Sequence, residues 1–245
     1  MNNLTNKVIL ITGSSKGIGS ATAQLLAQQG AQVVINYASS DEDAQHTLDA
    51  IRNEGGNAIK IKADVSDTEQ VKAMFKEVLT VYGKLDMLIN CAGIMKNKPF
   101  NEVTQDDYTS QYDVNVRGIF NTMQEAFNHL QDDGKIINFS SSTTKMMLPS
   151  YAIYSSTKAA IEQMSRVVSQ EIGRGITVNC IAPGPTETDL FLKGKSQEFI
   201  KELEGKSPFN RLAQPEDIAK VVQLMVSDNS QWITGQVINA NGGIV

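Results

Sequence analysis

The sequence predicts an α/β fold, in which a single domain holds a doubly wound parallel sheet of about seven strands with helices on both faces. Apolar runs alternate with longer segments of helical period, and glycines or acidic and hydroxyl residues occupy the joints. No linker, internal repeat or low-complexity tract divides the chain of 245 residues. Unbroken apolar strands are typical of parallel sheets buried on both faces, and this length fits one large domain.

The order of the elements follows from these alternations. The expected strands are Val8–Thr12, Gln32–Tyr37, Ala58–Ala63, Leu85–Asn90, Lys135–Ser140, Ile176–Ile181 and Gln236–Asn239. The expected helices are 17–29, 41–53, 67–82, 104–130, 152–173 and 215–227. Residues 184–214 break the alternation with a longer, mixed connection. Because a long connection after a strand's carboxyl end is where an active-site lid lies, we expect a substrate lid near 184–214.

Composition excludes several classes of function. The net charge is −5, no basic cluster occurs, and no apolar run is long enough to span a membrane. The N-terminus runs directly into a strand-like segment, so we expect no signal peptide. Cys91 and Cys180 stand alone in apolar runs, as in reduced proteins. We therefore expect a cytoplasmic protein that binds neither nucleic acid nor membranes, and we expect no metal site.

A glycine-rich turn follows the first strand. Gly13-Ser14-Ser15-Lys16-Gly17-Ile18-Gly19 lies between that strand and the first helix. Glycines there permit a tight turn and a close approach of the backbone to a pyrophosphate, and the helix N-terminus supplies free N–H groups. Such a turn can also be merely structural, but its position between the first strand and a helix favours a nucleotide site.

The second strand indicates which nucleotide binds. It ends Asn36-Tyr37-Ala38-Ser39-Ser40, without the acid that usually accepts a ribose 2′-hydroxyl in NAD sites. The acids that follow, 41–43, fit the first turn of the next helix. Lys16 could reach a 2′-phosphate, with Ser39 or Ser40 adding hydrogen bonds, or it could be a solvated loop lysine. These features favour NADP(H) over NAD.

Other strand ends reach the same edge of the sheet. The third strand ends at Asp64-Val65, and the fourth ends in Asn90-Cys91-Ala92-Gly93, whose small residues leave room for a ligand. Alone, either could be an ordinary strand exit.

The helix at 152–173 carries a tyrosine and a lysine one turn apart. At about 100° per residue, Lys158 falls within about 40° of Tyr154, on the stripe of Ile161 and Ser165. Glu162 is expected on the other side, with the charged face. A lysine on an inward stripe needs a polar partner, and a phenol one turn away is suitable.

A nearby lysine can supply most of the free energy needed to lower the pKa of Tyr154. Lowering a tyrosine pKa from about 10 to about 7 requires roughly 4 kcal/mol. A cation about 5 Å away contributes on the order of 3 kcal/mol at an effective dielectric of about 20, and an oxidised nicotinamide would add to this. Tyr154 could then act as a general acid or base near neutral pH. Tyr151, at the expected helix start, lies too far along the helix for Lys158 to tune it strongly.

Two further polar residues accompany this pair. Ser141, at the end of the fifth strand, could bond and polarise a substrate oxygen, or belong to a serine-rich turn. Asn115 lies on an inward stripe of the 104–130 helix, where it must be hydrogen-bonded. It could hold a water in a proton relay, or only fix a helix kink.

Together these residues resemble the short-chain dehydrogenase/reductase family. The resemblance spans Thr12 to Gly243 and includes T-G-S-S-K-G-I-G at 12–19, Asp64, N-C-A-G at 90–93, Asn115, Ser141, Y-S-S-T-K at 154–158 and P-G-P-T-E-T at 183–188. It implies a Rossmann-type fold and a homotetramer or dimer, with interfaces on the two long helices and the C-terminal strand. Cys91 departs from the asparagine or alanine of many members, which should alter only packing.

The resemblance also implies roles for the site residues. Tyr154 is the acid/base, Lys158 binds the nicotinamide ribose and lowers the tyrosine pKa, Ser141 orients the substrate, and Asn115 supports a water relay. The 183–188 stretch resembles the segment that holds the nicotinamide carboxamide. The expected cofactor-binding residues are Gly13, Ser15, Lys16, Gly17, Ile18, Gly19, Asn36, Ser39, Asp64, Val65, Asn90, Ala92, Gly93, Tyr154, Lys158, Pro183, Gly184, Thr186 and Thr188.

The substrate is less defined. The stretches 208–219 and 233–243 resemble 3-oxoacyl-acyl-carrier-protein reductases and their broad-specificity relatives. Carrier protein is acidic, so its docking surface should be basic. Arg174 fits such a surface, but the acidic loop at Asp132-Asp133 weakens the prediction that carrier protein binds. Met146, Met147, Leu148, Phe191 and Leu192 suggest an adaptable apolar pocket or simple packing. We expect an NADPH-dependent reductase of ketones or aldehydes, with 3-oxoacyl thioesters as the leading specific substrates. The alternative is a non-catalytic NADP(H)-binding sensor.

Overall fold

The computed structural model describes residues 4–245. Residues 1–3, the start of the stretch in which we expect no signal peptide, lie outside the described residues. Within 4–245 one sheet of seven strands is parallel throughout, in the order β3-β2-β1-β4-β5-β6-β7. The order reverses between β1 and β4, which opens a crevice at the carboxyl ends of these strands. The α/β fold predicted from the alternating pattern is therefore confirmed.

The observed elements follow the predicted ones closely. The strands are β1 (Val8–Thr12), β2 (Gln32–Tyr37), β3 (Asn57–Lys62), β4 (Leu85–Asn90), β5 (Leu130–Phe139), β6 (Thr177–Pro183) and β7 (Val237–Ala240). The main helices are α1 (Gly17–Gln28), α2 (Asp41–Asn53), α3 (Thr68–Tyr82), α4 (Gln105–Tyr112), α5 (Gly118–His129), α7 (Ala152–Glu171) and α10 (Pro215–Met225).

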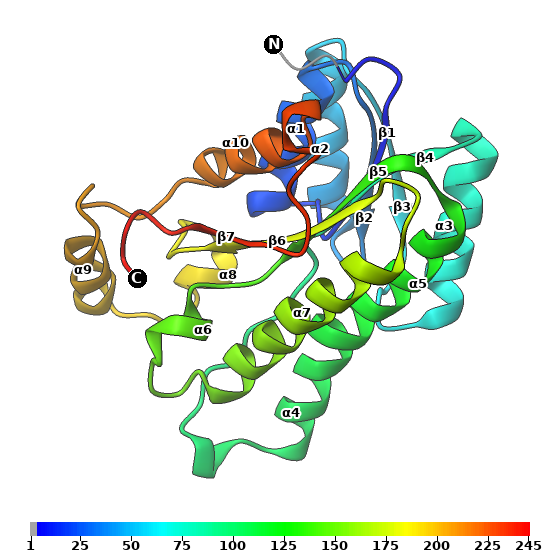
Figure 1. Cartoon of the computed structure of the whole chain (residues 1–245). Coiled ribbons are helices and arrows are strands. Elements are labelled where there is room, and N and C mark those ends of the chain that lie inside the picture. The colour runs from blue at the N-terminus through cyan, green and yellow to red at the C-terminus, as the bar shows by residue number, and fades with distance from the viewer. Residues whose placement is uncertain (1–3) are drawn as a thin grey trace.

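The helices cover the sheet in two layers. Helices α1, α2 and α10 pack on one face, and α3, α5 and α7 on the other (Figure 1). Each layer buries its own apolar core against the sheet, which explains why the strands are apolar on both faces. Among residues 4–245, no helix combines the length and apolarity that crossing a membrane needs.

The helix expected over 104–130 is not continuous. Residues Asp113–Arg117 form a π-helical turn between α4 and α5. The spacing of apolar residues does not distinguish a helix with one extra residue in a turn from a regular one. Such turns are rare and are frequently found at functional sites.

The segment 184–214 carries two short helices, α8 (Asp189–Leu192) and α9 (Gln197–Lys206), beyond the carboxyl ends of β6 and β7 (Figure 1). Its two ends are tied together, because Ala213 N donates to Pro185 O at 2.9 Å and Glu187 N donates to Ala213 O at 2.8 Å. The residues between these ties form a closed loop over the sheet edge. A further short helix, α6 (Thr143–Met146), follows β5.

Candidate active site

The glycine turn lies against the end of β4. Gly13 has a φ of +61°, and a Cβ there would stand 2.6 Å from the Cα of Ala92. A Cβ on Gly19 would stand 2.4 Å from the Gly13 carbonyl oxygen. Only glycine fits either position, so β1, β4 and α1 meet as closely as the spacing predicted.

Helix α1 begins with free donors that fit a pyrophosphate. Its N-cap is Lys16, whose side chain makes no capping hydrogen bond. The N–H groups of the first turn therefore remain able to donate to a ligand. No acidic residue stands in that turn. The uncapped N-terminus and the glycine cradle fit the phosphates of a dinucleotide.

The residues behind the turn hold it in place. Asn36 is buried, accepts a bond from Gly13 N at 3.4 Å, and donates to Ala63 O at 3.0 Å. Ser14 Oγ donates to Ile11 O at 2.6 Å. The side chain of Asn36 therefore links β1, β2 and β3 beneath the turn rather than standing free in the crevice.

Lys16 stands between the start of α2 and the lid. Its Nζ lies 3.4 Å from Asp189 of α8 and 3.8 Å from Asp43 of α2. The side chain is 57% exposed. Ser39, just before α2, is also exposed. This places the lysine beside the end of β2, where the ribose of a dinucleotide lies in this fold.

The predicted residues at the ends of β3 and β4 divide into two groups. Asp64 is half-buried at the edge, where its Oδ1 accepts bonds from Ser66 N at 2.9 Å and Ser66 Oγ at 2.7 Å. Asn90 is buried, and its side chain bonds to Asn138 and Thr122, both at 2.8 Å. Its side chain joins β4 to β5 and α5, inside the protein.

Tyr154, Ser141 and Lys158 come together above the sheet. The buried Tyr154 lies in the first turn of α7, and Ser141 follows the end of β5. A hydrogen bond with Ser141 lowers the pKa of Tyr154. The Nζ of Lys158 lies 5.6 Å from the centroid of the Tyr154 ring and donates to Phe139 O at 2.8 Å. Lys158 thus faces inward, as its helical angle predicted.

The pKa of Tyr154 differs from the predicted value near 7. Burial raises this pKa to about 12, and the hydrogen bond with Ser141 only partly opposes the shift. Burial also lowers the pKa of Lys158 to about 8. A pKa near 7 follows from the attraction between Lys158 and the phenolate alone, without the free energy of removing the phenolate from water. In the chain alone, desolvation is the larger effect.

Asn115 occupies the π-helical turn and is fully buried. Its Oδ1 accepts from Ile94 N at 2.8 Å, and its Nδ2 donates to Ile94 O at 2.9 Å and to Thr157 Oγ1 at 3.1 Å. A Cβ on Gly93 would stand 3.3 Å from this Oδ1 and 3.6 Å from the Nζ of Lys158. These bonds tie the π-helical turn to the loop after β4, and the role of Asn115 in a water relay stays a prediction.

The predicted carboxamide segment approaches the glycine turn. A Cβ on Gly17 would stand 3.3 Å from Cγ2 of Thr188. Thr188 caps α8 by accepting from Phe191 N at 3.3 Å, and Thr186 Oγ1 donates to Gly184 O at 2.9 Å. The lid therefore reaches from β6 back to the first turn of α1.

The prediction for Glu162 from its helical angle is wrong. The sequence placed it on the charged side, but it is buried and accepts from Ser140 Oγ at 2.6 Å and Thr144 Oγ1 at 3.1 Å. Eight residues place it about 80° from Tyr154, at the margin of the inward stripe. Hydroxyl donors after β5 allow the carboxylate to be buried there. The serine and threonine run at 140–144 was the available signal.

The apolar residues proposed for a pocket differ in exposure. Met147 has a φ of +52° and is 86% exposed, whereas Met146, Leu148, Phe191 and Leu192 are half-buried. They lie at the end of α6, in the loop before α7 and in the lid. Met147 is therefore the residue of this group that packs least against the protein.

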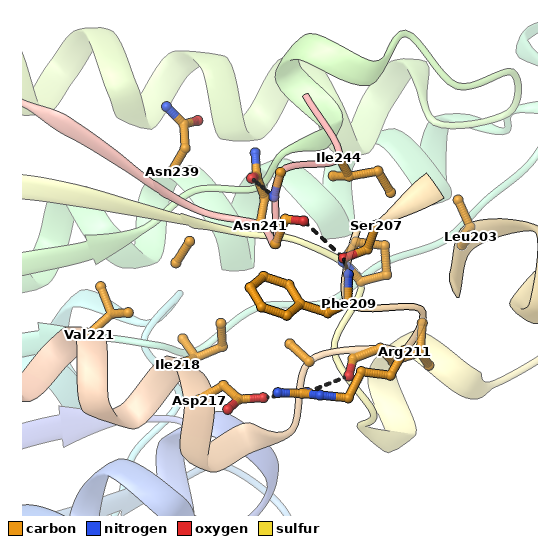
Figure 2. Close-up of a pocket in the computed structure, with 16 residues that line it drawn as sticks. Leu203, Ser207, Phe209, Arg211, Asp217, Ile218, Val221, Asn239, Asn241 and Ile244 are labelled. Atoms are coloured by element: carbon orange, nitrogen blue, oxygen red, sulfur yellow. Dashed lines mark hydrogen bonds and ion pairs between the residues drawn. The ribbon is translucent and has the colours of Figure 1, made fainter. Parts of the chain in front are cut away.

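A separate cavity of about 470 Å³ lies between the lid, α10 and the C-terminal segment. Figure 2 shows the ring of Phe209 beside it, with Arg211 paired to Asp217 at 2.6 Å and Ser207 bonded to Gly242 O at 2.8 Å. None of the catalytic cluster lines this cavity. The stretches 208–219 and 233–243 form its walls, so they anchor the lid to the C-terminus.

Arg174 is engaged at the far end of the sheet. Its guanidinium donates to Leu130 O at 2.7 Å and Phe127 O at 2.8 Å and pairs with Asp132 at 3.4 Å. Asp133 N donates back to Arg174 O at 2.8 Å. The arginine is therefore a structural brace of the loop before β5.

Comparisons with known proteins agree with this geometry. The family model described as "Enoyl-(Acyl carrier protein) reductase" matches residues 13–245. The chain is 41% identical over 247 residues to an uncharacterized oxidoreductase of Methylorubrum extorquens, covering 100% of both, and 39% identical to versicolorin reductase of Emericella nidulans, covering 98% and 96%.

Solved structures show the same fold. A short chain dehydrogenase from Burkholderia cenocepacia in complex with NADP superposes with a TM-score of 0.94 at 32% identity, covering 99% of both chains. Angucycline C-6 ketoreductase LanV with bound NADP gives 0.93 at 36%, covering 99% of this chain and 97% of that one. The family model that matches residues 13–245 and the relatives that match over nearly their full length show that this chain belongs to the short-chain dehydrogenase/reductase family of oxidoreductases.

Proposed function

We propose that the protein is an NADPH-dependent reductase that converts a ketone or aldehyde carbonyl to the alcohol. The observation that carries this proposal is the meeting of Ser141, Tyr154 and Lys158 at the crevice that begins with the glycine turn. Similarity to a ketoreductase with bound NADP and to versicolorin reductase supports both the chemistry and the cofactor.

Tyr154, Ser141 and Lys158 have different roles in the proposed reduction. Bound NADPH supplies the hydride. Tyr154 donates its phenolic proton to the carbonyl oxygen as negative charge develops there, and Ser141 donates a hydrogen bond to the same oxygen. With its pKa raised to about 12, Tyr154 holds its proton at neutral pH, as a general acid for reduction must. Charged Lys158 stabilises the phenolate that remains.

The substrate is a free carbonyl compound rather than one carried by acyl carrier protein. Reduction of a 3-oxoacyl group attached to that protein needs a basic docking surface beside the crevice. The residue considered for it, Arg174, lies instead at the far end of the sheet, where it bonds to the carbonyls of Leu130 and Phe127 and pairs with Asp132. Weak turnover of a carrier-protein substrate beside ready turnover of free ketones would support this choice.

The functional assembly we propose is a cytoplasmic homotetramer. Phe120 on α5 and Val167 on α7 are both 47% exposed, and Trp232 before β7 is 99% exposed. These apolar side chains lie on the long helices and near the C-terminal strand, where family members associate. Both cysteines are free, as expected in a reducing compartment.

A panel of ketones, aldehydes and acetoacetyl thioesters with NADPH or NADH tests the proposal by loss of absorbance. We expect turnover of at least one carbonyl class, with a clear preference for NADPH. Tight NADPH binding without turnover across the panel would instead favour the non-catalytic sensor.

A further inference from the structure

Lys195 is a half-buried cation in the lid, between α8 and α9. Its Nζ lies 4.5 Å from the centroid of the Phe191 ring and 5.9 Å from that of the Tyr151 ring, and it donates to the Phe191 carbonyl. Two aromatic faces and one carbonyl therefore fix its position.

No carboxylate neutralises this cation. None of the ion pairs formed within residues 4–245 includes Lys195. Burial lowers the pKa of Lys195, and no nearby acid opposes the shift. A lysine usually extends its charge into water, as the exposed Lys193 does two residues earlier. A cation kept partly out of water without an anion is ready to bind one.

Lys195 stands one aromatic ring away from the general acid. The ring of Tyr151 has its centroid 6.4 Å from that of Tyr154 and meets it edge-on, at 72°. The same Tyr151 ring faces the Nζ of Lys195 on the lid side. A substrate whose carbonyl oxygen bonds to Tyr154 and whose chain runs along Tyr151 would bring its far end to this ammonium group.

We propose that Lys195 selects keto acids, which are ketones that carry a carboxylate a short chain away from the reacting carbonyl. This inference rests on the proposed reductase function and names the substrate class of the same site. Lys195 is a specificity-determining residue here, because it meets the carboxylate and takes no part in proton or hydride transfer. The rival is that Lys195 only packs between the rings of Phe191 and Tyr151.

The test compares methyl-ketone acids of graded chain length with their methyl esters, which keep the ketone and lose the charge. We expect the wild-type enzyme to prefer the acid at one chain length in kcat/KM. Lys195→Gln should lower this acid-to-ester ratio about tenfold, mainly through KM of the acid, since a hydrogen bond to a charged group is lost. Lys195→Arg should restore most of the ratio, and Lys193→Gln should leave it unchanged.

Salt provides a second test that needs no variant. The wild-type preference for the acid should decline with ionic strength, because the ion pair is partly exposed. An equal loss of acid and ester turnover in Lys195→Gln would assign the lysine to packing and overturn the inference. Esters reduced as well as acids by the wild type would also overturn it while leaving the reductase function intact. Turnover of neither set by an enzyme that reduces other carbonyls of the panel would also overturn it, whereas no turnover of any carbonyl would remove the proposed function itself.

Discussion

At the scale of single residues, burial determines the pKa values of Tyr154 and Lys158. Tyr154 and Lys158 are both buried, and burial moves their pKa values in opposite directions, to about 12 and about 8. Each shift favours the neutral form. The phenol therefore keeps its proton at neutral pH, while the lysine remains mostly charged at pH 7 at a cost to stability. The sequence indicates the pairing through helical spacing, but desolvation depends on the surrounding fold.

The cost of burying Lys158 is measurable. Because its pKa is about 8 in the folded protein against 10.5 as the ordinary value, its charge destabilises the fold below pH 8, and this penalty fades as the pH rises from 8 to 10.5. We expect Lys158→Met to raise the free energy of unfolding at pH 7 by up to about 3 kcal/mol, with the gain vanishing above pH 10.5. Reduction should fall at least about a hundredfold.

Denaturant unfolding over this pH range tests the expectation, with exposed Lys76→Met as the control. A variant that is less stable than the wild type at pH 7 would show that the bond from Lys158 to the Phe139 carbonyl outweighs the desolvation of the charge.

We expect Lys16 to determine the preference for NADPH over NADH. Its contacts with Asp43 and Asp189 are exposed ion pairs at 3.8 and 3.4 Å, which a 2′-phosphate can replace. We expect Lys16→Ala to raise KM for NADPH about tenfold and to change KM for NADH little. Lys62→Ala removes another exposed cation from the neighbouring strand as a control. Equal changes in both KM values would contradict the assignment.

At the scale of elements, regular strands and helices follow the sequence pattern, and the distortions do not. The seven strands match the predicted runs closely because their burial on both faces leaves an unbroken apolar signal. The π-helical turn at Asp113–Arg117 leaves no such signal. It depends on bonds between Asn115 and Ile94, which are distant in sequence. An inward asparagine predicts a partner without identifying it.

We expect the side-chain hydrogen bonds of Asn115 to stabilise this π-helical turn. Asn115→Ala removes bonds to both backbone groups of Ile94 and to Thr157. We expect a loss of about 2–3 kcal/mol, or a fall in Tm of roughly 4–12 °C for a chain of this length. Activity should fall with it as the loop after β4 shifts. Exposed Asn128→Ala on α5 is the matched control. An unchanged Tm with lost activity would favour a water relay over the structural role.

At the scale of the whole molecule, one chain brings its site together from distant segments. The glycine turn, the end of β4, the loop after β5, the start of α7 and the lid all reach the carboxyl edge of one sheet. The alternating pattern predicts that edge, because parallel strands end on the same side. It could not predict Lys195 or Glu162, whose surroundings come from rings and hydroxyls that only the folded chain places beside them.

Assembly should depend on the exposed faces of α5 and α7. A double variant, Phe120→Glu and Val167→Glu, places charge on two apolar side chains that are each 47% exposed. We expect sedimentation to show a tetramer for the wild type and a species of half that mass for the variant, since buried like charges oppose association. Val81→Glu on α3, at a site 52% exposed, should leave the mass unchanged. A wild-type monomer would contradict the proposed assembly.

The most direct test of the account is carbonyl reduction by Tyr154→Phe, measured beside NADPH binding to the same variant. Phenylalanine keeps the buried ring and removes the hydroxyl that Ser141 contacts. We predict that reduction falls by at least about a thousandfold while the Kd for NADPH changes little, and that Tyr151→Phe alters only the substrate constants. Near-normal turnover by Tyr154→Phe would contradict the proposed mechanism.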